Sequence, residues 1–280
     1  MSVSPDVTDL IVIPARFGST RLPGKPLHPI AGQPLLRRVA AVAHQAAART
    51  GNVDVLVATD DERIVAAATG WGLETVLTSP AISSGSGRTL AAMRATGRRY
   101  ELVVNLQGDA PFTAPEHVVE ILAAARAGGA DVTTPVVRLD WARLDALRVH
   151  KRTTPASGTT CMRAEDGRAL WFSKAILPFM RNEAALRAET ALSPVLQHVG
   201  LYCYRPAALE AFEAAPPTRS EQLEGLEQLR LIEIGLDVRA VEVAPARITM
   251  SGIDSPADVE RAERLIAEHG DPFADWPRRA

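Results

Sequence analysis

Short β-rich runs alternate with segments of helical periodicity through the first half of this chain, and that alternation restricts the fold more than any other feature of the sequence. The β-rich runs span residues 10–14, 53–58, 74–78 and 102–106, and the helical segments span residues 35–49, 62–69, 89–96 and 116–126. Strands that alternate with helices build a parallel sheet covered by helices. We therefore expect an α/β fold with a mainly parallel, doubly wound sheet.

The rhythm changes near residue 140. After a strand at 131–137, a polar stretch at 150–160 predicts a loop. The pattern then predicts strands at 169–173 and 199–204, a helix at 221–235, strands at 238–243 and 247–251, and a closing helix at 256–269. We expect residues 1–139 and 237–280 to form the main α/β domain and residues 140–236 a smaller, mixed α+β region, with residues 271–280 loosely held. In the helix at 35–49, Arg38 and His44 lie off the apolar face, so we expect both side chains to point to solvent.

Composition and charge exclude several classes of protein. With 280 residues, of which 46% are hydrophobic, the chain can bury a full core. Its formal net charge of −2 argues against a general nucleic-acid or membrane surface, which needs clustered Lys and Arg. Cys161 and Cys203 lack metal-like or disulfide-framework spacing, and no apolar run is long enough for a membrane span or a leader. We therefore expect a cytoplasmic protein.

A loop with three cations follows the first predicted strand. Arg16, Arg21 and Lys25 are spaced through it together with Gly18 and Gly24. In an open α/β sheet, ligands bind at the carboxyl ends of the strands, and glycine allows a ligand to approach the backbone. Any one of these cations could simply be solvated, but the spaced set predicts a grip for a triphosphate. The pattern is neither a Walker A loop nor the G-x-G-x-x-G of dinucleotide binders.

Two aspartates are the next candidates. Asp109 follows the strand at 102–106, and Asp254 follows the strand expected at 247–251, so both should face the same crevice as the cationic loop. A magnesium triphosphate takes one or two carboxylates from the protein and its other ligands from phosphate and water. Asp254 could instead cap the last helix, although Ser255 could also fill that role.

The stretch from Ile13 to Lys25, I-P-A-R-F-G-S-T-R-L-P-G-K, resembles the opening of the 3-deoxy-manno-octulosonate cytidylyltransferases, the CMP-Kdo synthetases, with CMP-sialic acid synthetases as more distant relatives. The runs V-N-L-Q-G-D, ending at Asp109, and G-I-D-S-P-A-D, containing Asp254, are also similar to that family. So are A-T-D at 58–60, S-G-S-G-R at 84–88, A-L-W-F-S-K at 169–174, H-V-G-L-Y at 198–202 and L-E-Q-L-R at 226–230. The resemblance runs from about residue 9 to 268.

That resemblance implies CTP as substrate, Mg²⁺ as cofactor, a small acidic acceptor and a homodimer. It implies that Asp109 and Asp254 hold the metal and that Arg16, Lys25 and Asp109 are catalytic. The implied nucleotide-binding residues are Ala15, Arg16, Ser19, Arg21, Lys25, Ser84, Gly85, Arg88 and Gln107, and the implied acceptor-binding residues are Lys174, His198, Tyr202, Glu227 and Gln228. Without the family pattern, His198 and Tyr202 could instead be core residues with satisfied polar tips, and Glu227 and Gln228 part of a solvated helix face.

The expected reaction follows from charge. An acceptor oxygen attacks the α-phosphate in line and pyrophosphate leaves, so catalysis consists of positioning and of neutralisation by metal, Lys and Arg. Arg16, Arg21 and Lys25 would hold the leaving phosphates, and Asp109 and Asp254 the magnesium. No covalent enzyme intermediate is required.

The sequence also departs from the family pattern. Gly87 and Ala110 stand where the family has acids, Lys174 stands where it has Arg, and residues 148–163 diverge. Two unit charges about 4 Å apart repel by roughly 4 kcal/mol at an effective dielectric near 20, so losing acids would favour a more anionic acceptor. A phosphonate such as phosphonoformate is therefore an alternative to a Kdo-like sugar acid.

Two further alternatives differ in class or substrate. A non-catalytic nucleotide-binding relative would be expected to lose a metal aspartate or the loop lysine, whereas Asp109, Asp254 and Lys25 are all present. A nucleotidyltransferase for another base or sugar is also compatible with the residues, because base choice rests largely on backbone contacts. We expect a cytidylyltransferase.

Overall fold

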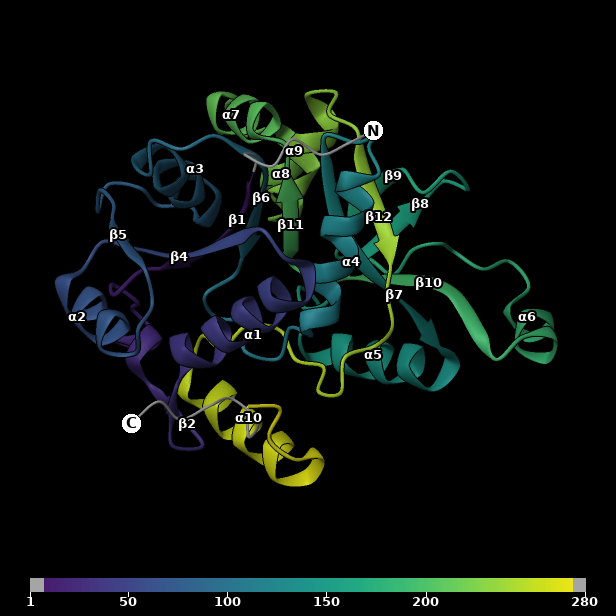
Figure 1. Ribbon diagram of the computed structural model, residues 1–280. Helices are drawn as coiled ribbons and strands as arrows, with labels where there is room; N and C mark the ends of the chain where they lie inside the picture. The colour runs from purple at the N-terminus through teal and green to yellow at the C-terminus, as the bar shows by residue number, and fades with distance from the viewer. Residues whose placement is uncertain (1–7, 274–280) are drawn as a thin grey trace.

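A computed structural model describes residues 8–273, which form a ten-stranded mixed sheet with helices on both faces (Figure 1). The strand order is β5-β4-β1-β6-β11-β7-β10-β8-β9, and β12 pairs with β7 outside this path. The strands are β1 Thr8–Ala15, β4 Val53–Thr59, β5 Thr75–Leu77, β6 Tyr100–Leu106, β7 Val132–Asp140, β8 Thr160–Arg163, β9 Ala169–Ser173, β10 Leu192–His198, β11 Leu201–Tyr204 and β12 Val238–Glu242; β2 Pro29–Ile30 and β3 Gln33–Pro34 form a separate hairpin.

The helices cover the sheet and its ends. They are α1 Leu35–Thr50, α2 Glu62–Gly70, α3 Gly85–Ala95, α4 Pro115–Arg126, α5 Trp141–Thr153, α6 Glu183–Glu189, α7 Pro206–Ala214, α8 Arg219–Glu224, α9 Gln228–Glu233 and α10 Pro256–His269, with a 3-10 turn, η1, at Lys25–Leu27. None of the helices in residues 8–273 has the length and apolar character needed to cross a membrane.

The expected α/β class is confirmed, and the sheet has two parts. Strands β5, β4, β1 and β6 are parallel, as the alternation in the first half of the chain predicts. Strand β11 runs antiparallel between β6 and β7, and β10, β8 and β9 continue antiparallel beyond β7. Because β11 comes from the predicted 140–236 region and lies inside the sheet, that region and the first half share one continuous sheet. A domain division at 140 and 236 stays a prediction.

Two apolar cores form on opposite faces of this sheet. On one face α1 and α4 pack on β1, β6 and β11 through residues such as Ile11, Val39 and Ile121. On the other face α3, α7 and α9 pack on the same strands through Leu90, Phe212 and Leu229. Side chains alternate along a strand, so a strand buried on both faces reads as a continuous apolar run, which explains the run at 10–13.

Several local expectations are wrong in instructive ways. The helix expected at 221–235 is two short helices, α8 and α9, because Gly225 ends the first one in the left-handed conformation with φ 62°. The loop expected at 150–160 is helical as far as Thr153, and residues 247–251 form no strand. Strands β8 and β10 and helices α5, α6 and α7 were not predicted, although Pro206 begins α7 as Pro often begins a helix.

Arg38 is the clearest correction on the helix face. The expectation of a solvent position is wrong, because its side chain is only 2% exposed. Its guanidinium donates to the Ile30 carbonyl at 2.7 and 2.9 Å and pairs with Asp271 at 2.7 Å. Asp271 belongs to the segment expected to be loose, most of which lies outside the described residues. His44 is half-buried, and burial lowers its pKa.

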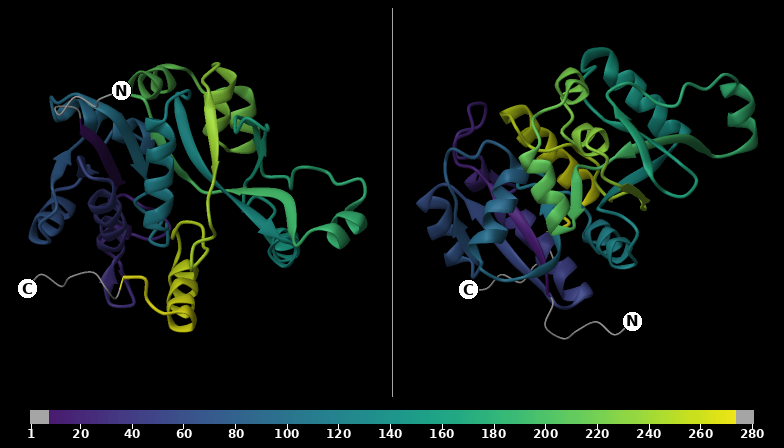
Figure 2. Two further views of the ribbon diagram at one scale, coloured as in Figure 1. Left: turned by 45° about the vertical axis from the view of Figure 1, so that its right-hand side comes forward. Right: turned by 90° about the horizontal axis from the view of Figure 1, so that it is seen from above.

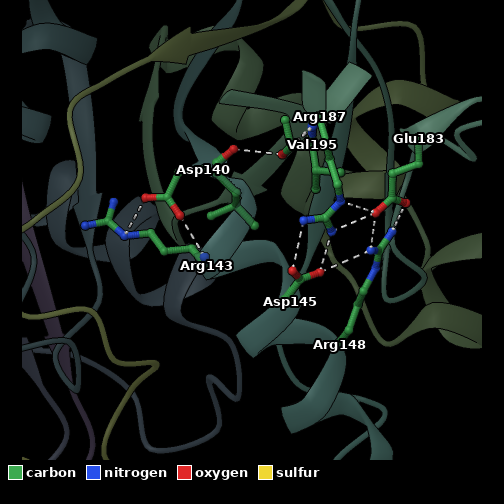
Figure 3. A network of polar contacts seen from close by, with 9 residues as sticks. Asp140, Arg143, Asp145, Arg148, Glu183, Arg187 and Val195 are labelled. Atoms are coloured by element: carbon green, nitrogen blue, oxygen red, sulfur yellow. Dashed lines mark hydrogen bonds and ion pairs between the residues drawn. The ribbon is translucent and has the colours of Figure 1, made fainter. Parts of the chain in front are cut away.

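An arm carrying α6 and the start of β10 extends away from the rest of the molecule (Figure 2). Four charged side chains connect it to α5 (Figure 3). Arg148 donates to both carboxylate oxygens of Glu183 at 2.7 Å, and Arg187 bridges Glu183 and Asp145 at 2.7 and 2.6 Å. Paired forks of this kind fix orientation better than single ion pairs do, so the network determines how the arm sits on α5.

Candidate nucleotide-binding site

The cationic loop leaves the carboxyl end of β1 and is anchored on its outer side. The amide of Phe17 donates to Asp60 at 3.2 Å, and the guanidinium of Arg63 lies 3.5 Å from the centre of the Phe17 ring. The hydroxyl of Ser19 accepts from the amide of Leu22 at 3.3 Å. These contacts hold the loop in one conformation, which preorganises its amides and cations for a ligand.

Lys25 joins the loop to both candidate metal aspartates. Its ammonium lies 2.8 Å from Asp109 and 2.9 Å from Asp254, and Arg21 pairs with Asp254 at 3.0 Å. Burial by itself would lower the pKa of Lys25, but the two carboxylates outweigh it and raise that pKa. Likewise burial raises the pKa of Asp254, yet the cations hold it below its usual value. Lys25 and Asp254 therefore both stay charged at neutral pH.

The backbone brings the two aspartates together. The carbonyl of Asp109 accepts from the amide of Ile253 at 2.9 Å, which sets Asp254 beside the end of β6. Ser255, not Asp254, caps α10, because its hydroxyl accepts from the amide of Asp258. The capping alternative for Asp254 is therefore wrong, and its carboxylate is available to the crevice.

Two glycines make this approach possible. A Cβ on Gly108 would lie 2.2 Å from the carbonyl oxygen of Pro14, and a Cβ on Gly252 would lie 2.9 Å from the carboxyl carbon of Asp109. Real Cβ atoms do not come so close to a backbone oxygen. Glycine is thus required where β1 and β6 end side by side.

These elements enclose a cavity of about 220 Å³ at the carboxyl ends of β1 and β6. All nine sequence-predicted nucleotide residues line it together with both predicted metal aspartates: Ala15, Arg16, Ser19, Arg21, Lys25, Ser84, Gly85, Arg88, Gln107, Asp109 and Asp254. The position matches the rule that open α/β sheets bind ligands beyond the carboxyl ends of their strands. Arg16 is exposed at the rim and forms no ion pair within residues 8–273.

Arg88 has a structural task as well as a place in the cavity wall. Its side chain is 3% exposed and donates to Asp60 at 3.1 Å and to the Ile82 carbonyl at 2.9 Å. Asp60 also accepts from the amide of Phe17, so Arg88 helps to hold the cationic loop from behind. The sequence patterns did not predict a role for Asp60. Its position in A-T-D, directly after β4, could have indicated that it lies at the same sheet edge as the cationic loop.

The predicted acceptor residues do not line that cavity: His198 and Tyr202 lie on β10 and β11, Lys174 follows β9, and Glu227 and Gln228 begin α9. Thr134 donates its one hydroxyl proton to the Leu201 carbonyl at 2.7 Å, so it must accept from Nε2–H of His198 at 2.8 Å. This leaves Nδ1 of His198 as an acceptor. Burial, aided by Lys174, lowers the pKa of His198 to about 3, so the ring is neutral.

The other members surround this histidine. The ring of Tyr202 lies 5.5 Å from that of His198, and Nζ of Lys174 lies 3.4 Å from the Thr159 hydroxyl. Glu227 is exposed as a residue, but desolvation of its carboxylate raises its pKa. It accepts from the Ser86 hydroxyl at 3.4 Å, and Gln228 is 5% exposed. Ser86 follows Gly85 in the first turn of α3, so the two predicted groups meet at the start of that helix.

Comparison with known proteins identifies the family. The sequence profile of the cytidylyltransferases matches residues 10–240. The chain belongs to the cytidylyltransferase family. It is 43% identical over 259 residues to a 3-deoxy-manno-octulosonate cytidylyltransferase of Anaeromyxobacter dehalogenans, covering 92% of this chain and 97% of the relative. The enzymes of the same name from Maricaulis maris and Escherichia coli are 39% and 36% identical, covering 94% and 92% of this chain and 98% and 96% of the relatives.

Solved structures agree with this assignment. A CMP:2-keto-3-deoxy-manno-octonic acid synthetase in complex with CTP superposes with a TM-score of 0.77 at 33% identity, covering 93% of this chain and 99% of that one. A 4-diphosphocytidyl-2C-methyl-D-erythritol synthase from Anaerococcus prevotii, at 12% identity and a TM-score of 0.57, shares the fold. The expectation of an enzyme that transfers nucleotidyl groups is thus confirmed for this cytidylyltransferase.

The donor set fits the magnesium expected of a nucleotidyltransferase. No group of three or more His, Cys, Asp or Glu side chains able to hold a metal exists within the described part of this cytidylyltransferase. Asp109 and Asp254 instead offer two carboxylates within hydrogen-bond distance of one ammonium, at the edge of the cavity. Two carboxylates plus phosphate oxygens and water are the ligands that Mg²⁺ takes in such sites.

Proposed function

We propose that this cytidylyltransferase transfers CMP from CTP to a hydroxyl of a Kdo-like sugar acid and releases pyrophosphate. The observation that carries the proposal is the convergence of Lys25, Arg21, Asp109 and Asp254 on the cavity at the ends of β1 and β6. The relatives named for that sugar acid, which this chain matches over more than nine-tenths of its length, support the acceptor.

The cations of the loop provide most of the chemistry. In the reaction the acceptor oxygen bonds to the α-phosphorus, the bond from that phosphorus to the bridging oxygen breaks, and pyrophosphate leaves with the electron pair while the hydroxyl proton passes to solvent. Arg16, Arg21 and Lys25 bind and neutralise the leaving phosphates. Arg16 can do so without breaking an existing pair among residues 8–273, whereas Lys25 and Arg21 must first share their carboxylates with the ligand.

Asp109 and Asp254 would hold Mg²⁺. When bound there, the metal supplies positive charge to the α-phosphate oxygens. The ammonium of Lys25 and the guanidinium of Arg21 together balance the charges of these two carboxylates. The same two aspartates thus keep Lys25 ordered near the phosphate position before substrate arrives.

The acceptor side is proposed to be the group around His198. Its neutral ring offers Nδ1 as a hydrogen-bond acceptor, and Lys174 offers a cation for the carboxylate of a sugar acid. Glu227 contacts Ser86 in the first turn of α3, which also lines the nucleotide cavity. An acceptor held between the two groups would reach the α-phosphate.

The case for a phosphonate acceptor weakens in the structure. It rested on two missing acids, at Gly87 and Ala110, but a carboxylate oxygen of Glu213 lies 2.8 Å from where a Cβ on Gly87 would be. One negative charge is therefore present in the space that the sequence indicated was empty. None of the three curated relatives described above is named for a phosphonate.

A homodimer and a cytoplasmic location remain proposals drawn from the family resemblance and the cysteines. Sedimentation equilibrium of the purified protein tests the first, because a dimer of this 30.0 kDa chain has twice that mass.

The deciding experiment is pyrophosphate release with CTP and Mg²⁺ across Kdo, sialic acid, phosphonoformate and other phosphonates, with Asp109→Ala as the blank. Release with Kdo alone supports the proposal. Release with a phosphonate alone would replace the acceptor, and release with another nucleotide would replace the base. If no pyrophosphate is released with any acceptor or any of the four nucleotides, a protein that binds nucleotides without transferring them is the better interpretation.

A further inference from the structure

The first turn of α3 lacks an acid that two other helices of this protein have. In α10, Ser255 caps the helix and Asp258, three residues on, accepts from the Ser255 amide at 2.9 Å and its hydroxyl at 2.7 Å. In α8, Thr218 and Glu221 form the same reciprocal arrangement. Such capping boxes satisfy the free amides at a helix start. In α3 the cap is Ser84, but the third residue is Gly87.

Glu213 of α7 brings a carboxylate to that place from another helix. A Cβ on Gly87 would lie 2.8 Å from Oε2 of Glu213 and 2.8 Å from Oγ of Ser84. The Ser84 hydroxyl accepts from the Gly87 amide at 2.9 Å and lies beside the Glu213 carboxylate, where it lowers the pKa of Glu213. A carboxylate at the start of a helix is also stabilised by the helix dipole. The acid that α3 does not carry in its own sequence is therefore supplied by α7.

The cost of placing the carboxylate there indicates that it has a use. Within the described chain, the other carboxylate oxygen of Glu213, Oε1, is buried without a hydrogen-bond partner. Burial and the neighbouring Glu227 raise the pKa of Glu213, with Arg230 acting in the opposite direction. An unpaired buried oxygen is unfavourable, and an alanine at this position would avoid it.

The contact controls a wall of the nucleotide cavity. Ser84 and Gly85 line that cavity, and Ser86 contacts Glu227 in the predicted acceptor group. We propose that Glu213 is a positioning residue for the nucleotide: it fixes the Ser84 hydroxyl and the first turn of α3 in the conformation that receives CTP. The inference rests on the proposed function only in taking CTP as the occupant of the cavity.

Two substitutions at Glu213 separate positioning from folding. Glu213→Ala removes the carboxylate and should raise the Kd of CTP with Mg²⁺, measured by calorimetry, about tenfold. Glu213→Gln keeps an acceptor for the Ser84 hydroxyl and should stay within about threefold of wild type. Glu210→Ala is the matched control, because Glu210 also joins α7 to α3, through an exposed ion pair with Arg94 at 3.1 Å. It should leave the Kd unchanged.

Hydrogen exchange supplies a readout that needs neither CTP nor an acceptor. In nucleotide-free Glu213→Ala, amides 85–88 should exchange faster than in wild type, while in Glu210→Ala they should not. The double variant Glu213→Ala/Gly87→Asp places an acid in α3 itself and should restore slow exchange and tight CTP binding.

Two results would overturn the inference: an unchanged Kd in Glu213→Ala, or unchanged exchange at 85–88. If the double variant restores neither slow exchange at 85–88 nor the Kd of CTP, an acid at position 87 cannot replace the carboxylate of Glu213, and that part of the inference is wrong. If wild type binds CTP but transfers nothing to Kdo, the proposed acceptor fails while these binding and exchange results still decide the role of Glu213.

Discussion

The ammonium of Lys25 lies 2.9 Å from the carboxylate of Asp254, a residue 229 positions further along the chain. The same ammonium contacts Asp109 at 2.8 Å, so one lysine side chain joins the first loop, the end of β6 and the approach to α10. Its removal leaves two partly buried carboxylates close together without that cation. The electrostatic balance of the site therefore depends on Lys25, the residue that we propose also binds the phosphates.

Lys25→Met should abolish most transfer. The variant loses the proposed phosphate contact and one of the two cations that balance Asp109 and Asp254, and removing one such electrostatic group costs roughly 10²–10³ in kcat. Steady-state pyrophosphate release measures this. Arg264→Met, on the exposed face of α10, is the control for a lost cation and should behave as wild type. A Lys25→Met enzyme within fivefold of wild type would contradict the assigned role.

Substitution of Asp254 should raise the Mg²⁺ concentration that the enzyme requires. Asp254→Asn keeps the size of the side chain but removes one charge from the donor set, so we expect the Mg²⁺ concentration for half-maximal activity to rise about tenfold or more. Titration of activity with Mg²⁺ at saturating CTP checks this. Asp258→Asn is the wrong kind of control because it disrupts the cap of α10; the exposed Glu260→Gln is the matched one. An unchanged magnesium requirement would remove Asp254 from the metal site.

Gly108→Ala should damage the site through the backbone. Its Cβ would lie 2.2 Å from the carbonyl oxygen of Pro14, so β1 and β6 must separate where the cavity begins. We expect a lower melting temperature and loss of CTP binding. Gly200→Ala, where a Cβ would meet no atom within 4 Å, is the control and should preserve both quantities. Equal melting temperatures for the two variants would show that the strand ends tolerate the displacement.

The parallel half of the sheet and the cavity could be predicted because they depend on local patterns. The strand ends at 15, 59 and 106 share one edge of a parallel sheet, so polar residues after those strands must converge, and Lys25 and Asp109 do. The strand expected at 247–251 failed because apolar residues there pack against α10 instead of pairing with a neighbour: Ile248 and Met250 lie in the small core that contains Ile253 and Ile266.

Contacts between distant segments could not be predicted. Arg38 can be buried because its guanidinium pairs with Asp271 and donates to the Ile30 carbonyl. Nothing in the periodicity of α1 indicates either partner. Glu213 is similar: its place beside Gly87 depends on how α7 packs on α3, whereas the sequence shows only an acid on a short helix. In both cases tertiary packing decides the environment of a charge.

Both thiols should be unreactive in the folded protein. Burial, only partly offset by Arg163, raises the pKa of Cys161 to about 12, and burial likewise raises that of Cys203. Since the thiolate is the reactive form, a thiol reagent at pH 8 should label neither residue until denaturant is added, when both should react. Rapid labelling of one thiol in native protein would mean that the sheet opens around β8 or β11.

Acid should loosen the arm before it unfolds the sheet. Hydrogen bonds from Arg148 and Arg187 lower the pKa of Glu183 from 4.5 to about 2. Because the folded pKa lies below the unfolded one, the stabilisation is complete above pH 4.5 and disappears as the pH falls toward 2. Wild type should therefore lose its stability advantage over Glu183→Gln across that interval, measured by urea unfolding. Glu189→Gln, on the same helix α6, should show no such convergence, and parallel curves for wild type and Glu183→Gln would exclude the network as its source.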